Sequence, residues 1–365
     1  MFFSKINDRA EQPIVLVAPL DWGLGHSTRC IPIVKELLAN NCRVILAADG
    51  AAALLLRQEF PGLQHIHLSG YRVRYSRRKS LLPLTMLVQI PKILHRIYKE
   101  HRWLKKVVLQ YNISGIIADN RFGLYHGGLP CIYITHQLAI QTGFRFTNWL
   151  FKKIHYWFIK KFSQCWVPDF AGEPNAAGKL SHPADLPAHV RYIGCISRFE
   201  KLQHPAIKYE VLVLLSGPEP QRSIFEAMLL KQLMLVNQKV LLVRGLPGNT
   251  LLPEAPGIDM VNHLPAPELN AAISSSNVII CRSGYTSIMD LLQMTKKAIL
   301  VPTPGQTEQE YLAQYLTEKK IFLSQSQKGF SVLNSLQAAA NFEYNLPVMD
   351  MEQYKTHVQQ FVESL

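Results

Sequence analysis

One stretch near the N-terminus, residues 14–28, reads IVLVAPLDWGLGHST. It joins a short apolar run of strand type to a turn with two glycines, and a helical pattern follows at residues 28–38. Residues 278–290, VIICRSGYTSIMD, show the same order of strand, glycine turn and helix. Strands that end in such turns are typical of parallel α/β sheets, whose ligands bind at the carboxyl ends of the strands.

The rest of the chain alternates in the same way, with a pause at residues 170–205. This alternation predicts two doubly wound, Rossmann-like α/β domains that face a cleft. We expect the first domain at residues 1–190, the second at 191–345, and a C-terminal helix at 346–365 that packs back on the first domain. Strands are expected at residues 14–18, 43–47, 64–68, 115–118, 131–135, 164–167, 211–215, 239–243, 259–261, 278–281 and 298–301. Helices are expected at residues 28–38, 83–110, 222–235, 286–294 and 308–316.

Composition supports two folded domains and shows an uneven charge. The 365 residues are 48% hydrophobic, which excludes wholesale disorder. The net charge is +13, and residues 1–190 hold 24 basic and 11 acidic side chains, whereas the remainder holds 15 of each. This asymmetry indicates an anionic partner for the first half only, either nucleic acid or a membrane surface. No nucleic-acid module is recognisable, so we expect no nucleic acid.

The cysteines and the lengths of the apolar runs indicate where in the cell the protein is found. The six cysteines are scattered without a CxxC pair, which indicates neither a zinc site nor a disulfide framework and fits a reducing cytosol. No run approaches the ~18–20 apolar residues that span a bilayer, and the N-terminus lacks a signal-peptide core. We therefore expect a cytoplasmic protein that is soluble or peripheral to a membrane.

Two glycine turns carry candidate functional residues. In the first, Gly23 and Gly25 let the backbone approach a ligand, and His26 at the loop tip is a candidate base. In the second, the Ser, Gly and Thr of residues 283–287 suit phosphate oxygens, and Asp290 suits two ribose hydroxyls. Each turn also has a plainer interpretation, in which the polar side chains only cap the following helix.

Two further strand-to-helix turns are less specific. The Pro-rich loop at residues 301–310 offers Gln306, Gln309 and Glu310 as partners for sugar hydroxyls, although a solvated helix cap explains it equally. The turn at Ser216 and Gly217 precedes another helix and is common in α/β proteins.

The order of these motifs resembles the donor half of the GT-B glycosyltransferases, and of glycosyltransferase family 28 in particular. The resemblance implies an acidic ribose ligand at Asp290, and an arginine that meets the diphosphate at Arg198, in the pair Gly194 and Arg198. It implies that a nucleotide-diphospho-sugar binds the following residues: Arg198, Ser216, Gly217, Arg282, Ser283, Gly284, Tyr285, Thr286, Ser287, Asp290, Pro304, Gly305, Gln306, Gln309 and Glu310.

The same resemblance implies a reaction. A hexose or N-acetylhexosamine would pass from a UDP-sugar to a hydroxyl of a glycan or lipid-linked acceptor, with inversion. No DxD carboxylate pair occurs, so we expect no metal and no cofactor, with Arg198, Arg282 and helix N-termini stabilising the leaving group. His26 is the first candidate base and Asp119 the second, while Gly23, Gly25, Asn120 and Arg121 are assigned to the acceptor side.

The basic half of the chain suggests where the acceptor lies. Residues 144–162 form an amphipathic pattern, with Lys152, Lys153, Tyr156 and Lys160 on one arc and Trp157 on the other. Residues 71–79 add a second basic and aromatic cluster. Such mixtures suit anionic headgroups, so we expect a peripheral enzyme at the inner face of the cytoplasmic membrane. The alternative is a helix packed on the first sheet with a solvated lysine face.

Three other functions remain open from the sequence. A UDP-sugar 2-epimerase shares the two-domain plan but needs acid and base carboxylates in the cleft. A non-catalytic nucleotide-sugar binder would use the same second-domain pocket. A dinucleotide-dependent dehydrogenase would need a fuller glycine fingerprint than residues 21–28 provide.

Overall fold

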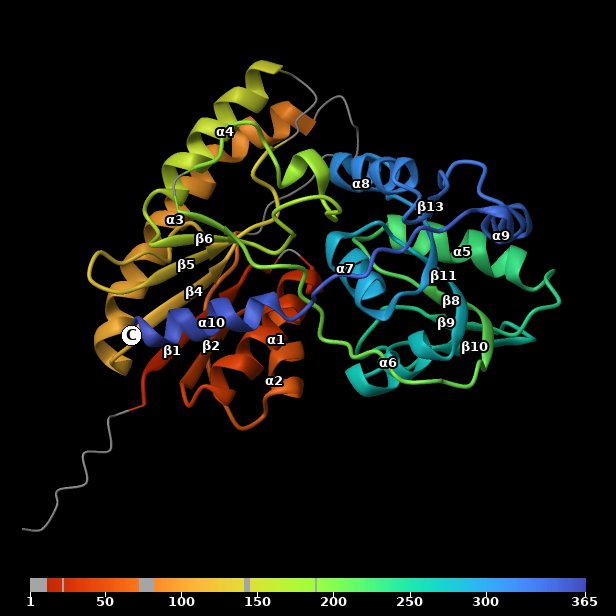
Figure 1. Cartoon of the computed structure of the whole chain (residues 1–365), viewed down its shortest axis with the longest axis horizontal. Helices are drawn as coiled ribbons and strands as arrows, with labels where there is room; N and C mark the ends of the chain where they lie inside the picture. Colours follow the sequence, from red (N-terminus) through yellow and green to blue (C-terminus); the bar gives the residue numbers. More distant parts are fainter. Residues whose placement is uncertain (1–11, 22, 72–81, 141–144, 188) are drawn as a thin grey trace, which may run out of the picture.

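The computed structural model describes residues 12–21, 23–71, 82–140, 145–187 and 189–365. Two α/β lobes lie side by side, and each contains one parallel sheet (Figure 1). The predicted fold class of two doubly wound domains is confirmed.

The first sheet has seven parallel strands in the order β3-β2-β1-β4-β5-β6-β7. Its strands are β1 Ile14–Pro19, β2 Arg43–Ala48, β3 Gln64–His67, β4 Gly115–Asp119, β5 Cys131–Ile134, β6 Gln164–Val167 and β7 Val190–Tyr192. Its helices are α1 Leu24–Ala39, α2 Gly50–Glu59, α3 Leu82–Tyr111 and α4 Arg145–Ile159, with a 3-10 turn η2 at Gly178–Leu180.

The second sheet has six parallel strands in the order β10-β9-β8-β11-β12-β13. Its strands are β8 Tyr209–Leu214, β9 Val240–Val243, β10 Ile258–Val261, β11 Ser276–Cys281, β12 Lys297–Leu300 and β13 Leu323–Ser324. The helices around it are α5 Gln221–Leu233, α6 Ala266–Ser274, α7 Tyr285–Met294, α8 Thr307–Glu318 and α9 Val332–Asn341.

Helices cover both faces of each sheet, which explains why the strands are apolar without alternation. In β1, the side chains from Val15 to Ala18 are completely buried on both faces. One face of the first sheet packs against α1 and α2, and the other against α3 and α4. In the second domain α6, α7 and α8 cover one face, and α5 and α9 cover the other.

The chain crosses back to the first domain at its C-terminus. Helix α10, Gln353–Glu363, lies across the first lobe against α1 (Figure 1). Val358 and Phe361 are buried there. Gly115 at the start of β4 lies so close that an added Cβ would stand 2.7 Å from the Phe361 Cζ atom. The first domain is therefore built from both ends of the sequence.

The region between the domains differs from the expected one. Strand β7 extends the first sheet to Tyr192, beyond the expected boundary at residue 190. The segment between β6 and β7 is not a linker, because Phe170, Ala176 and Leu180 belong to the buried cluster of the second domain. This segment holds the two lobes together, and the crossing between the sheets follows β7.

The position of α10 predicts a stability effect. Replacing Phe361 by Ala should lower the free energy of unfolding by about 3–5 kcal/mol, because a buried aromatic ring is lost and a cavity remains. The control is Gln360→Ala on the exposed side of α10, with an expected effect within about 0.5 kcal/mol. The measurement is urea unfolding, and equal losses in the two variants would contradict the packing of α10.

Candidate active site

His26 lies in the first turn of α1, since the helix begins at Leu24 and not at the expected residue 28. Its Nδ1 atom is 2.8 Å from Asp119 Oδ1, at the carboxyl end of β4. Strands β1 and β4 are neighbours in the sheet, so the helix that follows β1 starts directly beside the end of β4. The structure thus pairs the two candidate bases of the sequence.

Arg29, one helical turn after His26, holds the carboxylate from the other side. Its Nε and Nη2 atoms donate to the two oxygens of Asp119. Asp119 is completely buried and Arg29 is 2% exposed. Burial alone would raise the pKa of the Asp119 carboxyl, but Arg29 and His26 outweigh it and hold that pKa below its usual range.

This arrangement gives Asp119 and His26 different roles. Nδ1 of His26 faces the Asp119 carboxylate at 2.8 Å and also Nη2 of Arg29, which only donates, at 3.0 Å. One ring nitrogen cannot serve both groups, so we assign its proton to the shorter contact with the ionised Asp119, which leaves the Nε2 lone pair for another group. Burial lowers the pKa of His26, Arg29 and His136 lower it further, and Asp119 opposes them. His26 is therefore neutral at pH 7 and suited to act as a base. Asp119 has no exposed surface, so its predicted role as a second base is wrong.

Arg121 and Asn120 are also placed differently from expectation. Arg121 is completely buried and donates to the carbonyl of Pro19 at 2.8 Å and to Glu100 at 2.9 Å. It cannot contact an acceptor, because these bonds hold the loops of the first domain together. The side chain of Asn120 accepts from the Tyr133 hydroxyl at 3.1 Å. The acceptor assignment of Arg121 is therefore corrected.

The second glycine turn of the sequence lies against the first. Gly284 is the N-cap of α7, and a Cβ added there would meet nothing within 4 Å, so its backbone faces open space. Thr286 donates through Oγ1 to the Gly25 carbonyl at 3.2 Å. A Cβ on Gly25 would stand 2.8 Å from that same Oγ1 atom, which explains the glycine. The N-termini of α1 and α7 therefore meet beside His26.

Three expected donor residues at this turn are structural instead. Arg282 is 1% exposed and donates to the carbonyls of Val301, Pro302 and Gln221. Ser283 is buried and its hydroxyl donates to the Gln309 carbonyl at 2.8 Å. Tyr285 is buried with its hydroxyl bonded to the Pro168 carbonyl. They brace the turn and leave Gly284, Thr286 and Ser287 as its partly exposed residues.

Asp290 lies one turn further along α7 and points toward the crossing between the domains. Its Oδ1 atom accepts from the Ser197 hydroxyl at 2.6 Å. Burial raises the pKa of Asp290 to about 6, against the effects of Arg198 and Ser197. Arg198 itself lies 3.7 Å from Glu59 on α2 of the first domain. Arg198 thus contacts both lobes near Asp290. Its ion pair with Glu59 offsets part of the positive charge that we expected Arg198 to offer to the diphosphate.

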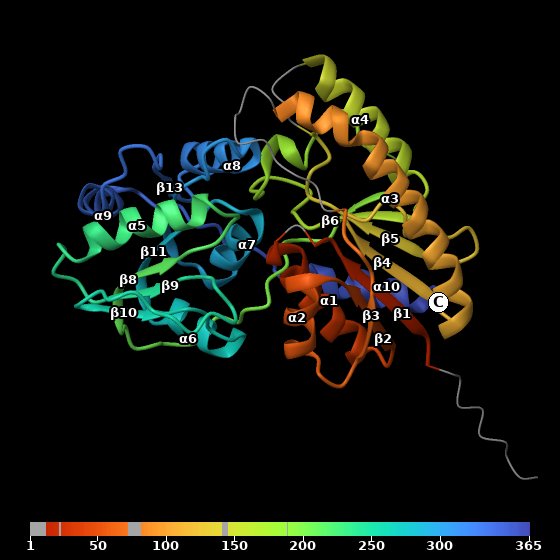
Figure 2. The same cartoon turned by 180° about the vertical axis from the view of Figure 1, so that it is seen from behind.

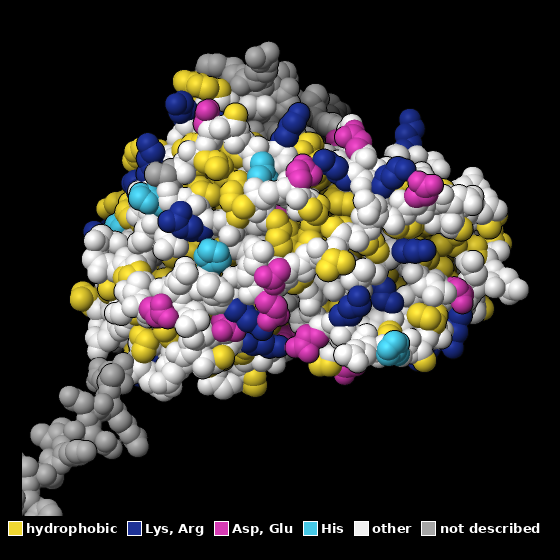
Figure 3. All heavy atoms as spheres, in the orientation of Figure 1, with side chains coloured by type: hydrophobic (Ala, Val, Ile, Leu, Met, Phe, Trp, Pro, Cys, Tyr) yellow, Lys and Arg dark blue, Asp and Glu magenta, His cyan; other side chains and the backbone are white. Residues whose placement is uncertain are grey.

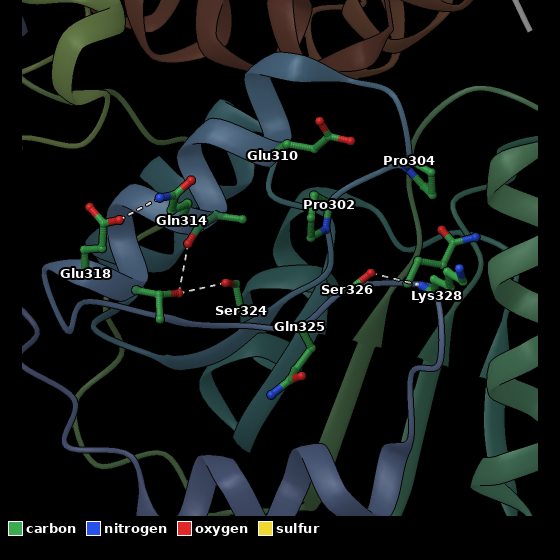
Figure 4. A pocket seen from close by; sticks show the side chains of 12 residues that line it. Pro302, Pro304, Glu310, Gln314, Glu318, Ser324, Gln325, Ser326 and Lys328 are labelled. Atoms are coloured by element: carbon green, nitrogen blue, oxygen red, sulfur yellow. Dashed lines mark hydrogen bonds between the residues drawn. The ribbon is translucent and has the colours of Figure 1, made fainter. Parts of the chain in front are cut away.

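The Pro-rich loop before α8 is held by its own side chains. The Gln309 side chain accepts from the Thr303 backbone N–H at 2.9 Å, and Glu310 accepts from the Gly305 N–H at 3.0 Å. Gln306 is the N-cap of α8 and Pro304 is exposed. A groove of about 560 Å³ lies between this loop and the segment after β13 (Figure 4). Pro304 and Glu310 line it, so it opens beside the expected sugar site.

The loop after β8 presents its backbone to solvent. Ser216 and Gly217 are exposed, and Gly217 has a φ of 101°, which favours glycine. Helix α5 begins four residues later, at Gln221. Together with the start of α7, this gives two helix N-termini at the carboxyl edge of the second sheet, an arrangement that suits a diphosphate.

Three residues near His26 were not predicted from the sequence: Arg29, His136 and Glu308. Arg29 contacts Asp119, and its Nη1 atom is 3.2 Å from His136 Nδ1. His136 Nε2 is 2.8 Å from Glu308 Oε1 on α8 of the second domain. The signal for His136 was its position just after β5, the same kind of position that identified Asp119. Arg29 lies three residues after His26, a spacing that puts both on one helix face.

Metal-binding geometry is not found in the described part of the chain, where no group of three or more His, Cys, Asp or Glu side chains could hold an ion. The described residues also contain no helix that is long and apolar enough to span a bilayer.

The C-terminal part of the chain resembles a known protein family. Residues 258–363 match the model of the glycosyltransferase family 28 C-terminal domain. The chain is similar to the family 28 glycosyltransferases. No protein with a curated description matches it by sequence.

Solved structures extend the likeness to both domains of the chain. A glycosyltransferase of kitacinnamycin matches with a TM-score of 0.61 at 13% identity, over 97% of this chain and 95% of that one. The glycosyltransferase SsfS6 of Streptomyces sp. SF2575, complexed with thymidine diphosphate, matches at 0.59 and 14% over 97% and 95%. MurG of Acinetobacter baumannii matches at 0.52 and 12% over 96% and 95%. At these identities the structures establish the GT-B fold.

The buried pair of Arg29 and Asp119 predicts a large stability effect. Arg29→Met should lower the free energy of unfolding by about 3–5 kcal/mol at pH 7, because it leaves a buried carboxylate without its counter-charge. The loss should shrink below about pH 4. In the variant, a protonated Asp119 needs no counter-charge. In the wild type, the stability that comes from the lowered pKa of Asp119 is lost as the pH falls. Urea unfolding at several pH values measures this.

The control for that experiment is Arg57→Met, which removes an exposed arginine from α2 and should change stability by at most about 0.5 kcal/mol. A loss in Arg29→Met that is small, or that does not depend on pH, would contradict the ionised state of Asp119.

Proposed function

We propose that this glycosyltransferase moves a hexose or N-acetylhexosamine from a nucleotide-diphospho-sugar, with a UDP-sugar as the first choice, to a hydroxyl of a glycan or lipid-linked acceptor. His26 takes the proton of the attacking hydroxyl through Nε2, and Asp119 orients the ring through Nδ1. The observation that carries the proposal is the contact of Thr286 with Gly25, because it sets the base beside the helix N-terminus suited to the donor.

The donor half of the proposal rests on backbone rather than on arginine side chains. The N-termini of α5 and α7, with the exposed backbone at Gly217 and Gly284, would meet the diphosphate. Asp290 would accept from the ribose, and its pKa of about 6 leaves it mostly ionised at pH 7. The complex of SsfS6 with thymidine diphosphate supports a nucleoside diphosphate as the leaving group here as well.

The stereochemical and metal proposals follow from this machinery. One base and one leaving group on opposite sides of the sugar imply inversion at the anomeric carbon. Helix dipoles and backbone N–H groups can stabilise the departing diphosphate, so we propose turnover without a metal. An epimerase is less well supported, because the Asp119 carboxylate of the cleft is buried and paired with Arg29.

We also propose that the acceptor is presented at the inner face of the cytoplasmic membrane. Helices α3 and α4 lie side by side along the outer edge of the first lobe in both views (Figures 1 and 2). The exposed face of α4 carries Trp149, Lys153 and Trp157 within one arc of the helix, and the exposed Lys160 follows directly after its end. On the face seen in Figure 3, hydrophobic and basic side chains mix over this edge.

The arrangement on α4 differs from the expected one in a way that favours this proposal. His155 and Phe158 turn inward and pack against Phe122, so Trp157 lies with the lysines and not opposite them. Exposed tryptophans beside lysines suit the headgroup zone of an anionic bilayer. Of the second basic and aromatic cluster, predicted at residues 71–79, Tyr71 is buried and bonded to Glu100, and residues 72–79 lie outside the described residues.

The role of His26 predicts both a rate and a pH dependence. Replacing His26 by Gln should lower kcat by about 10²–10⁴-fold, because general base catalysis is lost. In the wild type kcat/KM should fall on acidification with a midpoint below 6.5, since burial lowers the pKa of His26 and only the neutral ring accepts a proton. The assay is release of UDP in the presence of acceptor.

His204→Asn is the matched control, because His204 is exposed between the domains and its positive φ of 48° suits Asn. It should leave kcat unchanged. Undiminished turnover in His26→Gln would show that another group is the base.

Membrane binding is tested by sedimentation with liposomes of rising anionic-lipid content. Binding should increase with anionic lipid, decrease with salt, and fall when Lys153 and Lys160 become Glu or Trp157 becomes Ala. Lys231→Glu with Lys239→Glu makes the same charge change on the second domain and should have little effect. Negligible pelleting under all conditions would favour a soluble acceptor.

A further inference from the structure

One carboxylate of the second domain reaches into the basic cluster of the first. Glu308 lies in the first turn of α8, and its Oε1 atom is 2.8 Å from Nε2 of His136. Its other oxygen accepts from the side-chain amide of Gln137. Both partners follow β5 in the first sheet, so this contact joins the carboxyl edges of the two sheets.

His136 links Glu308 to Arg29, and through Arg29 and Asp119 to the proposed base, His26. The Arg29 guanidinium only donates hydrogen bonds, so Nδ1 of His136, at 3.2 Å from Nη1, is an acceptor. The proton of the neutral His136 ring is then on Nε2 and is donated to Glu308. Parallel stacking on Tyr285, with 4.2 Å between the ring centres, fixes the plane of the His136 ring. Arg29 in turn holds Asp119, which orients His26.

We propose that Glu308 is a positioning residue, whose bond to His136 fixes Arg29, Asp119 and His26 in their catalytic arrangement when the two domains meet. This inference rests on the proposed role of His26 as the base. The first domain alone therefore does not complete this series of hydrogen bonds. Its last member, Glu308, comes from α8 of the second domain, the helix that follows the expected sugar loop.

Two other residues of α8 contact the first half of the chain without a hydrogen-bonded link to His26. Tyr311 and Tyr315, also on α8, bond to the Lys179 N–H and to the Asn175 side chain, each at 2.8 Å. Both hydroxyls meet the segment between β6 and β7, and these bonds do not lead to the chain that ends at His26. Tyr315→Phe therefore removes a hydrogen bond between the domains without touching that chain, and it is the matched control.

The charge of Glu308 makes the link measurable. The groups that face His26 are Asp119 from β4, Arg29 from α1, His136 from the end of β5 and Glu308 from α8. Charged His26 lowers the pKa of Glu308, so by reciprocity the Glu308 carboxylate favours protonated His26. Glu308→Gln should therefore move the titration of His26 to lower pH.

The experiment is an NMR pH titration of the nucleotide-free full chain with ¹³C-labelled histidine, in which the signal lost in His26→Gln identifies His26. We expect a shift to lower pH in Glu308→Gln and none in Tyr315→Phe. In His136→Phe, which keeps an aromatic ring on Tyr285, a second change of Glu308 to Gln should have a smaller effect, because only the direct effect of the Glu308 charge remains. An unchanged titration in Glu308→Gln, or an undiminished shift in the His136→Phe background, would overturn the inference.

Kinetics separate this inference from the proposed function. Glu308→Gln should lower kcat by about 10-fold with little change in KM for the nucleotide sugar, as expected when a residue that orients the catalytic groups is lost. A rise in kcat would mean that Glu308 only blocks the cleft and would also overturn the inference. If no variant and no wild type transfers sugar, the proposed function fails, while the titration still decides the role of Glu308.

Discussion

The ionised carboxylate of Asp119 is the constraint on which the first domain depends. A carboxylate without any exposed surface costs several kcal/mol unless a counter-charge and hydrogen bonds replace water. Arg29 supplies both, and its position one turn after His26 places the two side chains on the same face of α1. The side chain that stabilises the fold therefore also determines the orientation of the proposed base.

The second domain also buries an arginine near the start of a helix, but for a different purpose. Arg282, in the turn before α7, donates to carbonyl groups and shapes the loop, while the backbone at Gly284 faces open space. Two sheets thus present their carboxyl edges to each other, one with the proposed base and one with helix N-termini. The segment between β6 and β7, buried in the second domain, keeps these edges together.

The sequence predicted the two sheets because fully buried parallel strands are apolar at every position, but the short strands β7 and β13 carry too few residues to give that pattern. Motif positions identified His26, Asp119 and Asp290. Residue type alone does not show whether a side chain points into the core or toward a ligand. Arg121 and Arg282 were therefore assigned to ligands, although both are buried. Glu308 was missed because its partner, His136, is 172 residues away and in the other domain.

We propose that the second domain binds a nucleoside diphosphate opposite His26. Isothermal titration calorimetry at pH 7.5, where Asp290 is ionised, tests it with UDP, thymidine diphosphate and NAD. We expect at least one nucleoside diphosphate to bind, with an affinity weaker by about 10-fold or more in Asp290→Ala, and we expect NAD not to bind. Failure of both nucleoside diphosphates to bind, or binding that Asp290→Ala leaves unchanged, would contradict it.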